Sequence, residues 1–477
     1  MNKVMLLYPP GRMFMRGEDR CQANIEASTT VAMRACNDLG YAAAVLLQRD
    51  YEVFLRDYQT ERATQADVKR DILAFEPDFI LISTTNATIY EDIAQIAEIR
   101  SYCRAKFMLK GALFYAPEKA MLELLDLSLV ECLIGGEIDT VIGSLADYYL
   151  RGIGEIQAIP SILYQENGMF APTRFHAWED RLDDIPFPAR QLMNNALYVR
   201  PDTGEPMATI QTARGCPSNC VFCLTPGLSG KKVRFRSPEN VFQEIAECYH
   251  KYNIRNFFFK ADTFTINAQW VHALCDLIRQ SDLNGKIAFA ANSRVSPLSR
   301  EILREMKAAG CFMIAFGFET GSAETLEKIK KGTTLEQARQ ARKWAKEAGI
   351  PVNAFYMIGF PWEDEGHLRE TKKLIFELDA EFIELALALP YYGTELYAMC
   401  QEEGLLAGEE VLGLDYFSGR QCGTQYVSEE YLLKYRKQLL LRYYLRPSYL
   451  LKRLFYSVKN PKIFLNYVKY GLKMLRQ

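Results

Sequence analysis

Residues 1 to about 150 alternate short apolar runs with segments in which apolar residues recur every three or four positions. The apolar runs predict buried strands, and the recurring segments predict helices over 67–75 and 89–103. The expected strands are KVMLLYPP (3–10), AAAVLLQ (42–48), DFILISTT (78–85), KFMLKGA (106–112) and VECLIGG (130–136). Strand–helix alternation predicts an α/β domain with a Rossmann-like, doubly wound parallel sheet. Ligands of such sheets bind where the strands end.

Residues 151–205 lose this alternation, and RLDDIPFPARQL (181–192) is typical of a linker lying over a surface. From 206 to 400 six apolar runs return, separated by helical segments: MATIQTAR (207–214), RNFFFKAD (255–262), KIAFAANS (286–293), CFMIAFGFE (311–319), PVNAFYMIGF (351–360) and FIELALALP (382–390). Six βα units predict a partial (β/α)6 barrel of TIM type with an open side.

Helix boundaries in this region have recognisable signals. Ser237–Pro238 and Ser296–Pro297 each offer a capping serine followed by proline at the first helical position. Gly310 and Gly349 stand where a left-handed residue ends a helix.

Residues 401–477 predict a C-terminal helical region with a basic and aromatic character. Tyr431 to Gln477 contains twelve Lys and Arg and no acidic residue. One interpretation is a packed tail whose lysine stems cover apolar surface. The other is an interfacial amphipathic segment that contacts anionic lipid.

Composition narrows the class of protein. The chain has 477 residues, 49% hydrophobic and 24% charged, and a net charge of −2, which argues against a general nucleic-acid binder. It shows no signal segment and no apolar run of membrane-spanning length, so a cytoplasmic location is expected. Disulfides are rare in that compartment. Nine of the twelve cysteines are scattered and are expected to be small buried hydrophobes.

The remaining cysteines, Cys216, Cys220 and Cys223, lie together in ARGCPSNCVFCLTP (213–226). Structural zinc takes four ligands, usually from two separated pairs, and the sequence has neither a second pair nor a nearby histidine. A 4Fe-4S cluster held by three thiolates leaves one iron open for a substrate. The spacing, directly after the first barrel strand, favours the cluster over zinc or three buried thiols.

TARGCPSNCVFC resembles the signature of the radical S-adenosylmethionine (SAM) enzymes. The first domain and the DDIPFPAR linker are also similar to the branch that has an N-terminal cobalamin-binding domain, which includes methyltransferases and cyclases. The resemblance implies that Cys216, Cys220 and Cys223 hold a 4Fe-4S cluster whose open iron binds SAM, which is then cleaved to a 5′-deoxyadenosyl radical. It also implies a set of SAM-binding residues: Phe222, Asp262, Thr263, Asn292, Arg294, Glu319, Gly359 and Pro361.

The same resemblance implies cobalamin on the strand-end loops of the first domain, near Ser83, Thr84, Gly111 and Gly136. No Asp-x-His-x-x-Gly motif is present, and the first histidine is His176, so no histidine of this domain is expected to coordinate cobalt.

The function implied is that of a methyltransferase acting on an unactivated carbon of a sizeable, lipid-like substrate through the deoxyadenosyl radical. Two alternatives stay open: an oxidative cyclase or rearrangement enzyme without methyl transfer, and a non-catalytic cobalamin- or cluster-binding sensor. The expected partners are a small-molecule or lipid-like substrate and a flavodoxin- or ferredoxin-type electron donor. Nucleic acid is not expected, and peripheral membrane contact is expected through the C-terminal tail. The sequence assigns no residue a direct catalytic role.

Overall fold

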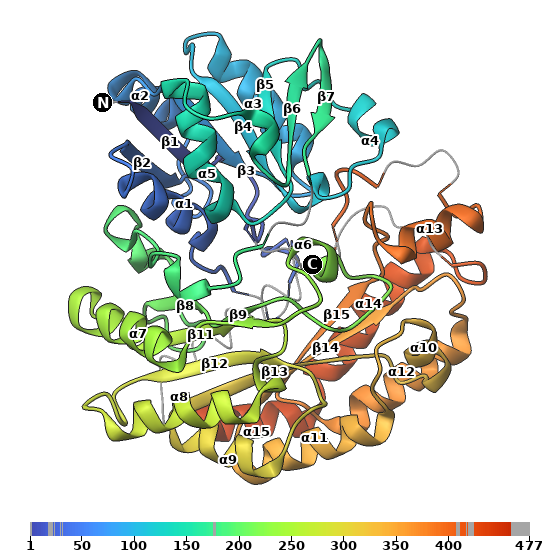
Figure 1. Cartoon of the computed structure of the whole chain (residues 1–477). Coiled ribbons are helices and arrows are strands. Elements are labelled where there is room, and N and C mark those ends of the chain that lie inside the picture. The colour runs from blue at the N-terminus through green and yellow to red at the C-terminus, as the bar shows by residue number, and fades with distance from the viewer. Residues whose placement is uncertain are drawn as a thin grey trace.

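The chain forms two lobes, each built on one sheet (Figure 1). The computed structural model describes residues 2–17, 22, 24–28, 30, 32–174, 178–406, 411–415, 417 and 424–458. The first lobe contains a seven-stranded sheet of order β2-β1-β3-β4-β5-β6-β7, and the second a six-stranded sheet of order β15-β14-β13-β12-β11-β8. A third, two-stranded sheet is a short ribbon of β9 (Ala213–Arg214) and β10 (Arg234–Phe235).

The first sheet is parallel over its five leading strands, β1 (Lys3–Tyr8), β2 (Glu52–Asp57), β3 (Phe79–Ser83), β4 (Lys106–Lys110) and β5 (Val130–Ile134). Apolar side chains of α1 (Asn37–Leu47) and α5 (Ile138–Ala146) pack on one face. Those of α2 (Gln65–Phe75), α3 (Ile89–Arg100) and the short α4 (Lys119–Glu123) pack on the other. Because both faces are covered, the inner strands are apolar throughout. The predicted doubly wound sheet is confirmed.

One predicted strand of this domain is wrong. Residues 42–48 lie almost wholly in helix α1, and the second strand is β2, which the apolar pattern does not predict. Helix α1 is buried around most of its circumference, so it lacks the polar face that marks an amphipathic helix. The alanine run favours helix by propensity, whereas β2 is an edge strand with charged positions.

The stretch interpreted as a linker contains part of the first sheet. Strands β6 (Ile162–Glu166) and β7 (Met169–Pro172) form a hairpin that extends the sheet antiparallel beyond β5. After them the chain runs to the barrel through short turns. Among the described residues, short helical turns span 112–114, 147–151, 156–158, 182–184, 190–192, 195–197 and 264–266.

The second sheet contains all six predicted barrel strands: β8 (Met207–Gln211), β11 (Asn256–Lys260), β12 (Ala288–Ser293), β13 (Cys311–Glu319), β14 (Val352–Ile358) and β15 (Phe382–Leu387). Every neighbouring pair is parallel. Its outer face is covered by helices α7 (Pro238–Tyr252), α8 (Ala268–Gln280), α9 (Arg300–Ala308), α11 (Leu335–Ala348) and α12 (Glu365–Leu378) (Figure 1). The short α10 (Ala323–Lys328) packs instead in a separate apolar cluster with Val221 and Phe360. The predicted partial barrel is confirmed.

The predicted helix boundaries are confirmed except at one site. The Ser237 side chain caps α7 by accepting a hydrogen bond from the backbone amide of Asn240. Gly310 and Gly349 have positive φ at helix ends. Ser296–Pro297 does not start a helix. Its peptide bond is cis, and α9 begins at Arg300 with Ser299 as the capping residue.

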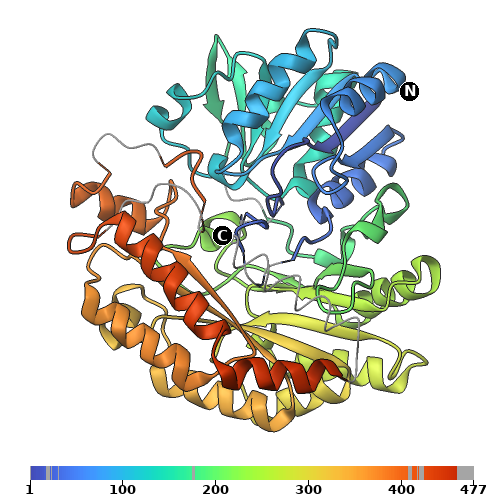
Figure 2. The same ribbon diagram turned by 180° about the vertical axis from the view of Figure 1, so that it is seen from behind.

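The C-terminal helices explain why the barrel ends at six strands. After α13 (Glu395–Glu402), helix α14 (Glu429–Tyr444) lies beside the edge strand β15, and α15 (Pro447–Val458) follows it (Figure 2). The Tyr444 hydroxyl accepts from the Ile383 amide at 2.8 Å and donates to the Ile383 carbonyl at 2.7 Å, and Arg436 donates to the Leu385 carbonyl at 2.6 Å. Side chains thus satisfy the backbone groups that a seventh strand would pair.

This arrangement supports the packed-tail interpretation for α14, whereas residues 459–477 of the basic segment lie outside the described residues. The described helices include none with the length and apolar character needed to cross a membrane. Among the scattered cysteines, Cys103 is half-buried, Cys21 and Cys422 lie outside the described residues, and the others are buried as expected.

Candidate active site between the two domains

The cysteine motif lies on a loop (215–233) that follows β8 at its carboxyl end and is closed at its base by the β9–β10 ribbon. Within it, α6 (Thr225–Leu228) follows the last cysteine. Gly215 has a φ of +93°, and a Cβ there would lie 2.3 Å from the Lys232 carbonyl, so only glycine fits. The Cys216 amide donates to the Gly230 carbonyl at 3.0 Å. These contacts hold the two ends of the loop together.

The three thiols lie in a partly buried environment with cations nearby. Cys216 is buried, and Cys220 and Cys223 are half-buried. Burial raises the pKa of the Cys220 thiol, while the cations Lys331 and Arg294 act to lower it. Such cations favour the thiolate, the form that binds iron.

No three His, Cys, Asp or Glu side chains of the described residues are grouped so that they could hold one metal ion. The three cysteines therefore stay a prediction. The thiolates of a 4Fe-4S cluster are shared among its irons rather than gathered on one ion.

Two predicted SAM residues at the barrel rim have unsatisfied polar atoms. The Thr263 Oγ1 and the Asn292 Oδ1 are buried and have no hydrogen-bond partner within the described part of the chain. Nearly all buried polar atoms in proteins are paired. Asp262, next to Thr263, lines a cavity. This side of the rim therefore has the properties of a site for a polar ligand.

Arg294 and Glu319, by contrast, already have partners. Arg294 donates to the Lys331 carbonyl, and its Nη1 lies 3.9 Å from the Cys220 Sγ. Glu319, in the left-handed region at φ +65°, pairs with the Lys331 ammonium at 2.5 Å, and both side chains are buried. Lys331 is a site residue that sequence reasoning missed. In the sequence, Lys331 is marked only by its position before Gly332 in a loop, which does not indicate a role in the site.

The remaining predicted SAM residues lie at the end of β14 and in the cysteine loop. The ring of Phe222 packs against Phe360, with centroids 6.1 Å apart. Gly359 has a φ of +91°, and its amide donates to the Glu363 carboxylate at 2.7 Å. Burial raises the pKa of Glu363 to about 7. The Pro361 carbonyl accepts a hydrogen bond from the backbone amide of Gln425 at 2.9 Å. The structure therefore brings Phe222 and the Gly359 loop together.

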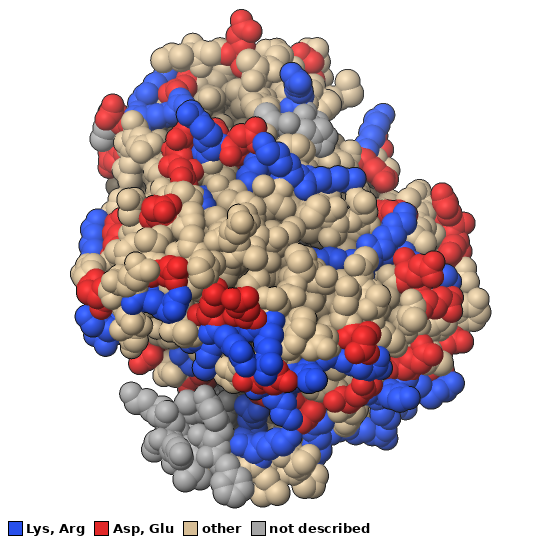
Figure 3. Space-filling view, turned by 60° about the horizontal axis from the view of Figure 1, so that its bottom comes forward, with Lys and Arg blue, Asp and Glu red and all other residues tan. Residues whose placement is uncertain are grey.

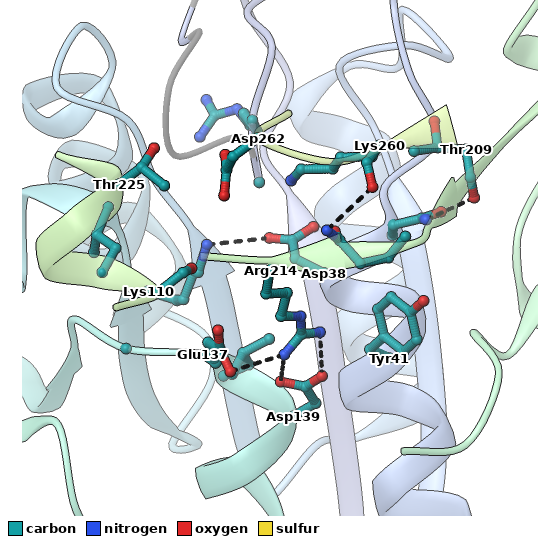
Figure 4. Close-up of a pocket in the computed structure, with 18 of the residues that line it drawn as sticks. Asp38, Tyr41, Lys110, Glu137, Asp139, Thr209, Arg214, Thr225, Lys260 and Asp262 are labelled. Atoms are coloured by element: carbon teal, nitrogen blue, oxygen red, sulfur yellow. Dashed lines mark hydrogen bonds and ion pairs between the residues drawn. The ribbon is translucent and has the colours of Figure 1, made fainter. Parts of the chain in front are cut away.

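A cavity lies where the strand ends of the two sheets face each other (Figure 4). Residues of the first domain on its wall are Arg16, Gly17, Ala35, Asn37, Asp38, Tyr41, Lys110 and Gly136 to Asp139. Residues of the second domain on its wall are Thr209, Gln211, Arg214, Thr225, Leu228, Ser229, Lys260 and Asp262. The cavity thus joins Gly136 of the predicted cobalamin set to Asp262 of the predicted SAM set.

The other predicted cobalamin residues mainly support their own domain. The Ser83 hydroxyl donates to Asp38 at 2.7 Å, and the Thr84 hydroxyl donates to Asp92 at 2.6 Å. A Cβ at Gly111 would lie 2.9 Å from the Thr84 methyl, so this glycine permits close packing of two loops.

Two residues on α1 have open polar atoms at the cavity instead. The Asn37 Oδ1 and the Tyr41 hydroxyl have no partner among the described residues. Sequence reasoning missed both, since it predicted a strand over the adjoining residues 42–48 and no helix beginning at Asn37.

Comparison with known proteins identifies the second domain. Residues 210–375 match the model of the radical SAM superfamily. The second domain is therefore a radical SAM domain. The chain is 29% identical over 430 residues to an uncharacterized methyltransferase of Pyrococcus horikoshii, covering 87% of this chain and 89% of that one. It is 26% identical to the cytidylyl-2-hydroxyethylphosphonate methyltransferase of Streptomyces wedmorensis, covering 86% and 84%.

Among solved structures, this radical SAM enzyme resembles the radical SAM methyltransferase TsrM of Kitasatospora setae, with a TM-score of 0.67. The match covers 85% of this chain and 79% of TsrM at 18% sequence identity, and that structure contains cobalamin and a [4Fe-4S] cluster. At this identity the likeness concerns the fold. Both domains are included in it.

Proposed function

We propose that this radical SAM enzyme binds cobalamin, SAM and a 4Fe-4S cluster together and methylates an unactivated carbon of its substrate. The observation that carries the proposal is the cavity between the two sets of strand ends, with Gly136 on one wall and Asp262 on the other. Hydrogen abstraction and methyl transfer at one carbon require both cofactor sites to open onto a common space.

The residues present fit these groups chemically. Three thiols share one loop, and the cations Arg294 and Lys331 beside Cys220 favour its thiolate form. The unpartnered Thr263 and Asn292 atoms suit the polar groups of SAM. The rim of a corrin ring has amide side chains, which suit the open atoms of Asn37 and Tyr41.

When bound, these cofactors supply hydrogen abstraction and the methyl group. The chain's own part is to bind, orient and exclude water. Thr263 and Asn292 would orient SAM. Gly359 has positive φ and permits close packing of Leu432 of α14, since a Cβ at Gly359 would lie 3.0 Å from that side chain. The two domains close over the cavity from opposite sides and limit the access of water.

The names of the relatives support methyl transfer, since two relatives that each cover most of this chain are named methyltransferases. The test is turnover of the anaerobically reconstituted full chain with SAM, cobalamin and a chemical reductant. A methyltransferase forms both S-adenosylhomocysteine and 5′-deoxyadenosine. A cyclase or rearrangement enzyme forms only the latter, and a sensor forms neither.

We further propose that the substrate is lipid-like and is presented at a membrane surface, with electrons delivered by a flavodoxin- or ferredoxin-type protein in the cytoplasm. The supporting feature is a leucine ridge on α15, formed by Leu450, Leu451 and Leu454, which are 50%, 55% and 46% exposed. Exposed apolar side chains on an amphipathic helix favour an interface. Figure 3 shows the helical side of the barrel, where basic and acidic patches are interspersed with uncharged surface.

Co-sedimentation with anionic liposomes tests the membrane proposal. Truncation before Tyr431 would remove α14 from the edge of the barrel, so substitution of the three leucines of the ridge by serine is the cleaner change. Leu73→Ser is the control, because Leu73 is 53% exposed on α2 in the other domain. Loss of binding only in the ridge variant supports the proposal, and equal binding of all three proteins contradicts it.

A further inference from the structure

The base of the cysteine loop presents two arginines to the first domain. Arg214 on β9 and Arg234 on β10 are register partners in the antiparallel ribbon. One stands just before the loop and the other just after it, so whatever holds the two guanidinium groups also holds the two ends of the loop.

The carboxylate partners of these arginines lie at the start of α5, directly after Gly136, and Arg234 also donates to the Glu179 carbonyl at 2.7 Å and to the Ser229 carbonyl at 2.8 Å. Arg234 donates to the Glu137 Oε1 at 2.6 Å and to Oε2 at 3.1 Å, and Arg214 donates to the same Oε2 at 3.1 Å. Arg214 also binds both oxygens of Asp139, at 3.0 and 2.5 Å (Figure 4). Two carboxylates of one domain thus hold two guanidinium groups of the other.

These ion pairs are buried, so the loss of one charged partner is costly. The side chains of Arg214, Glu137, Arg234 and Asp139 are 12%, 7%, 2% and 1% exposed. Charges removed from water in this way depend on their partners, and deletion of one partner leaves the others uncompensated. The N-terminal end of α5 also favours carboxylates electrostatically.

A similar cluster elsewhere provides a comparison. Glu244 on α7 is buried between Arg190, at 2.7 Å, and Arg236, at 2.5 Å. It also joins one carboxylate to two guanidinium groups. Its contacts stay within the barrel and the approach to it, and they do not reach the loop that contains Gly136.

We propose that Glu137 is a positioning residue that ties the loop after β5 to the ribbon closing the cysteine loop. Its effect is to order the cysteine loop from the first domain. A second consequence, which rests on the proposed function, is that cobalamin bound beside Gly136 and order in the cysteine loop stabilise each other, because coupling between sites is reciprocal.

Thiol alkylation in the reduced, cluster-free full chain tests the first part. Mass spectrometry follows the alkylation of Cys220 and Cys223, with half-buried Cys103 of the first domain as an internal reference. We expect Glu137→Gln to raise the alkylation rates of Cys220 and Cys223 by about tenfold, because the substitution removes hydrogen bonds to a charged group. Glu244→Gln should leave those rates unchanged, and Cys103 should react at the same rate in every protein.

Equal rates at Cys220 and Cys223 in wild type and Glu137→Gln would overturn the proposal, as would an equal increase in Glu244→Gln. Should Glu137→Gln fail to fold, Arg234→Lys replaces it. Lysine keeps the charge but loses the two-pronged contact with Glu137, so an intermediate increase in alkylation is expected. No increase in that folded variant would also overturn the proposal.

Hydroxocobalamin at saturating concentration tests the coupling. It should slow alkylation of Cys220 and Cys223 in the wild type and not in Glu137→Gln. If the wild type retains no corrin after desalting, the proposed function fails, and the cluster-free comparison still decides the role of Glu137. If corrin binds and slows both proteins equally, the coupling is overturned.

Discussion

The two rims that face the cavity differ in how their polar side chains are satisfied. At the first domain's rim, Ser83 and Thr84 donate to Asp38 and Asp92, and Arg16 pairs with Asp92 at 2.8 Å. At the barrel rim, Thr263 and Asn292 each have a buried polar atom without a partner within the described part of the chain. All four are small polar residues at the ends of parallel strands, yet the two hydroxyls of the first domain are paired and the two barrel residues each keep one open atom.

A polar residue at a strand end is therefore not by itself a ligand contact. A paired hydroxyl contributes to the stability of its own loop, whereas an unpaired buried atom gains a partner when a ligand arrives. By this criterion the open atoms of Asn37 and Tyr41 are better candidates for the first domain's ligand than Ser83 and Thr84.

The largest expected effect comes from Glu363, the buried carboxyl behind the Gly359 loop at the barrel rim. Burial raises its pKa from 4.5 to about 7, so the folded protein binds a proton that the unfolded chain has lost. Stability therefore falls as pH rises from about 4.5 to 7 and is level above that. The decrease should be about 3 kcal/mol, and Glu363→Gln should remove it. Urea titrations across this pH range provide the measurement, and an unchanged pH slope in the variant contradicts the prediction.

Thr263→Val tests the open side of the comparison. The change removes the unpartnered hydroxyl at nearly constant volume, so stability should be unchanged or slightly higher. The affinity for SAM should fall about tenfold, since a hydrogen bond to a charged ligand is lost. Equilibrium dialysis with the reconstituted protein measures the affinity, and Thr265→Val, whose hydroxyl is already bonded to Ser293, is the control. An unaltered SAM affinity in Thr263→Val argues against the site.

Thr84→Val tests the paired side. It removes a donor to the buried Asp92, so the free energy of unfolding should fall by about 1 to 2 kcal/mol. Cobalamin affinity should stay the same, whereas Tyr41→Phe should weaken it by about fivefold without loss of stability. Chemical denaturation and corrin titration distinguish the two variants. Weaker cobalamin binding in Thr84→Val would show that Thr84 contacts cobalamin, as the sequence predicts.

Tyr356→Phe has the smallest expected effect on stability. The hydroxyl of Tyr356 also has no partner among the described residues, but it is buried in the core between the sheet and its outer helices. Its removal should change stability by less than about 0.5 kcal/mol and should leave SAM binding unaltered. Tyr444→Phe, which removes two hydrogen bonds to Ile383, should cost about 1 to 3 kcal/mol. Thermal unfolding compares the two, and similar losses would contradict the account.

The sequence predicts the barrel better than the first domain for a physical reason. Each barrel strand is bounded by turn and capping residues, such as Ser237 and Gly349, that locate the adjoining helices. In the first domain, α1 is buried on most sides and β2 has charged positions, so neither shows the expected periodicity. The helix start predicted at Ser296–Pro297 is wrong because Ser299, three residues after Ser296, is the residue that caps α9.

The site is predictable only where one short motif contains it. The spacing of Cys216, Cys220 and Cys223 is local, and so the sequence predicts their shared loop. The Glu137–Arg214 contact joins residues 77 positions apart, and the Lys331–Glu319 contact joins the end of β13 to the loop after α10, so both arise from tertiary packing. Which polar atoms remain unpaired also depends on packing, and no sequence pattern reports it.

Anaerobic reconstitution of the full chain with iron, sulfide and hydroxocobalamin tests the central claim, that both cofactor sites face one cavity. We expect about four irons and one corrin per chain after desalting, with iron lost and corrin kept in Cys216→Ala. The same iron content in Cys216→Ala as in the wild type, or no corrin in the wild type, would contradict it.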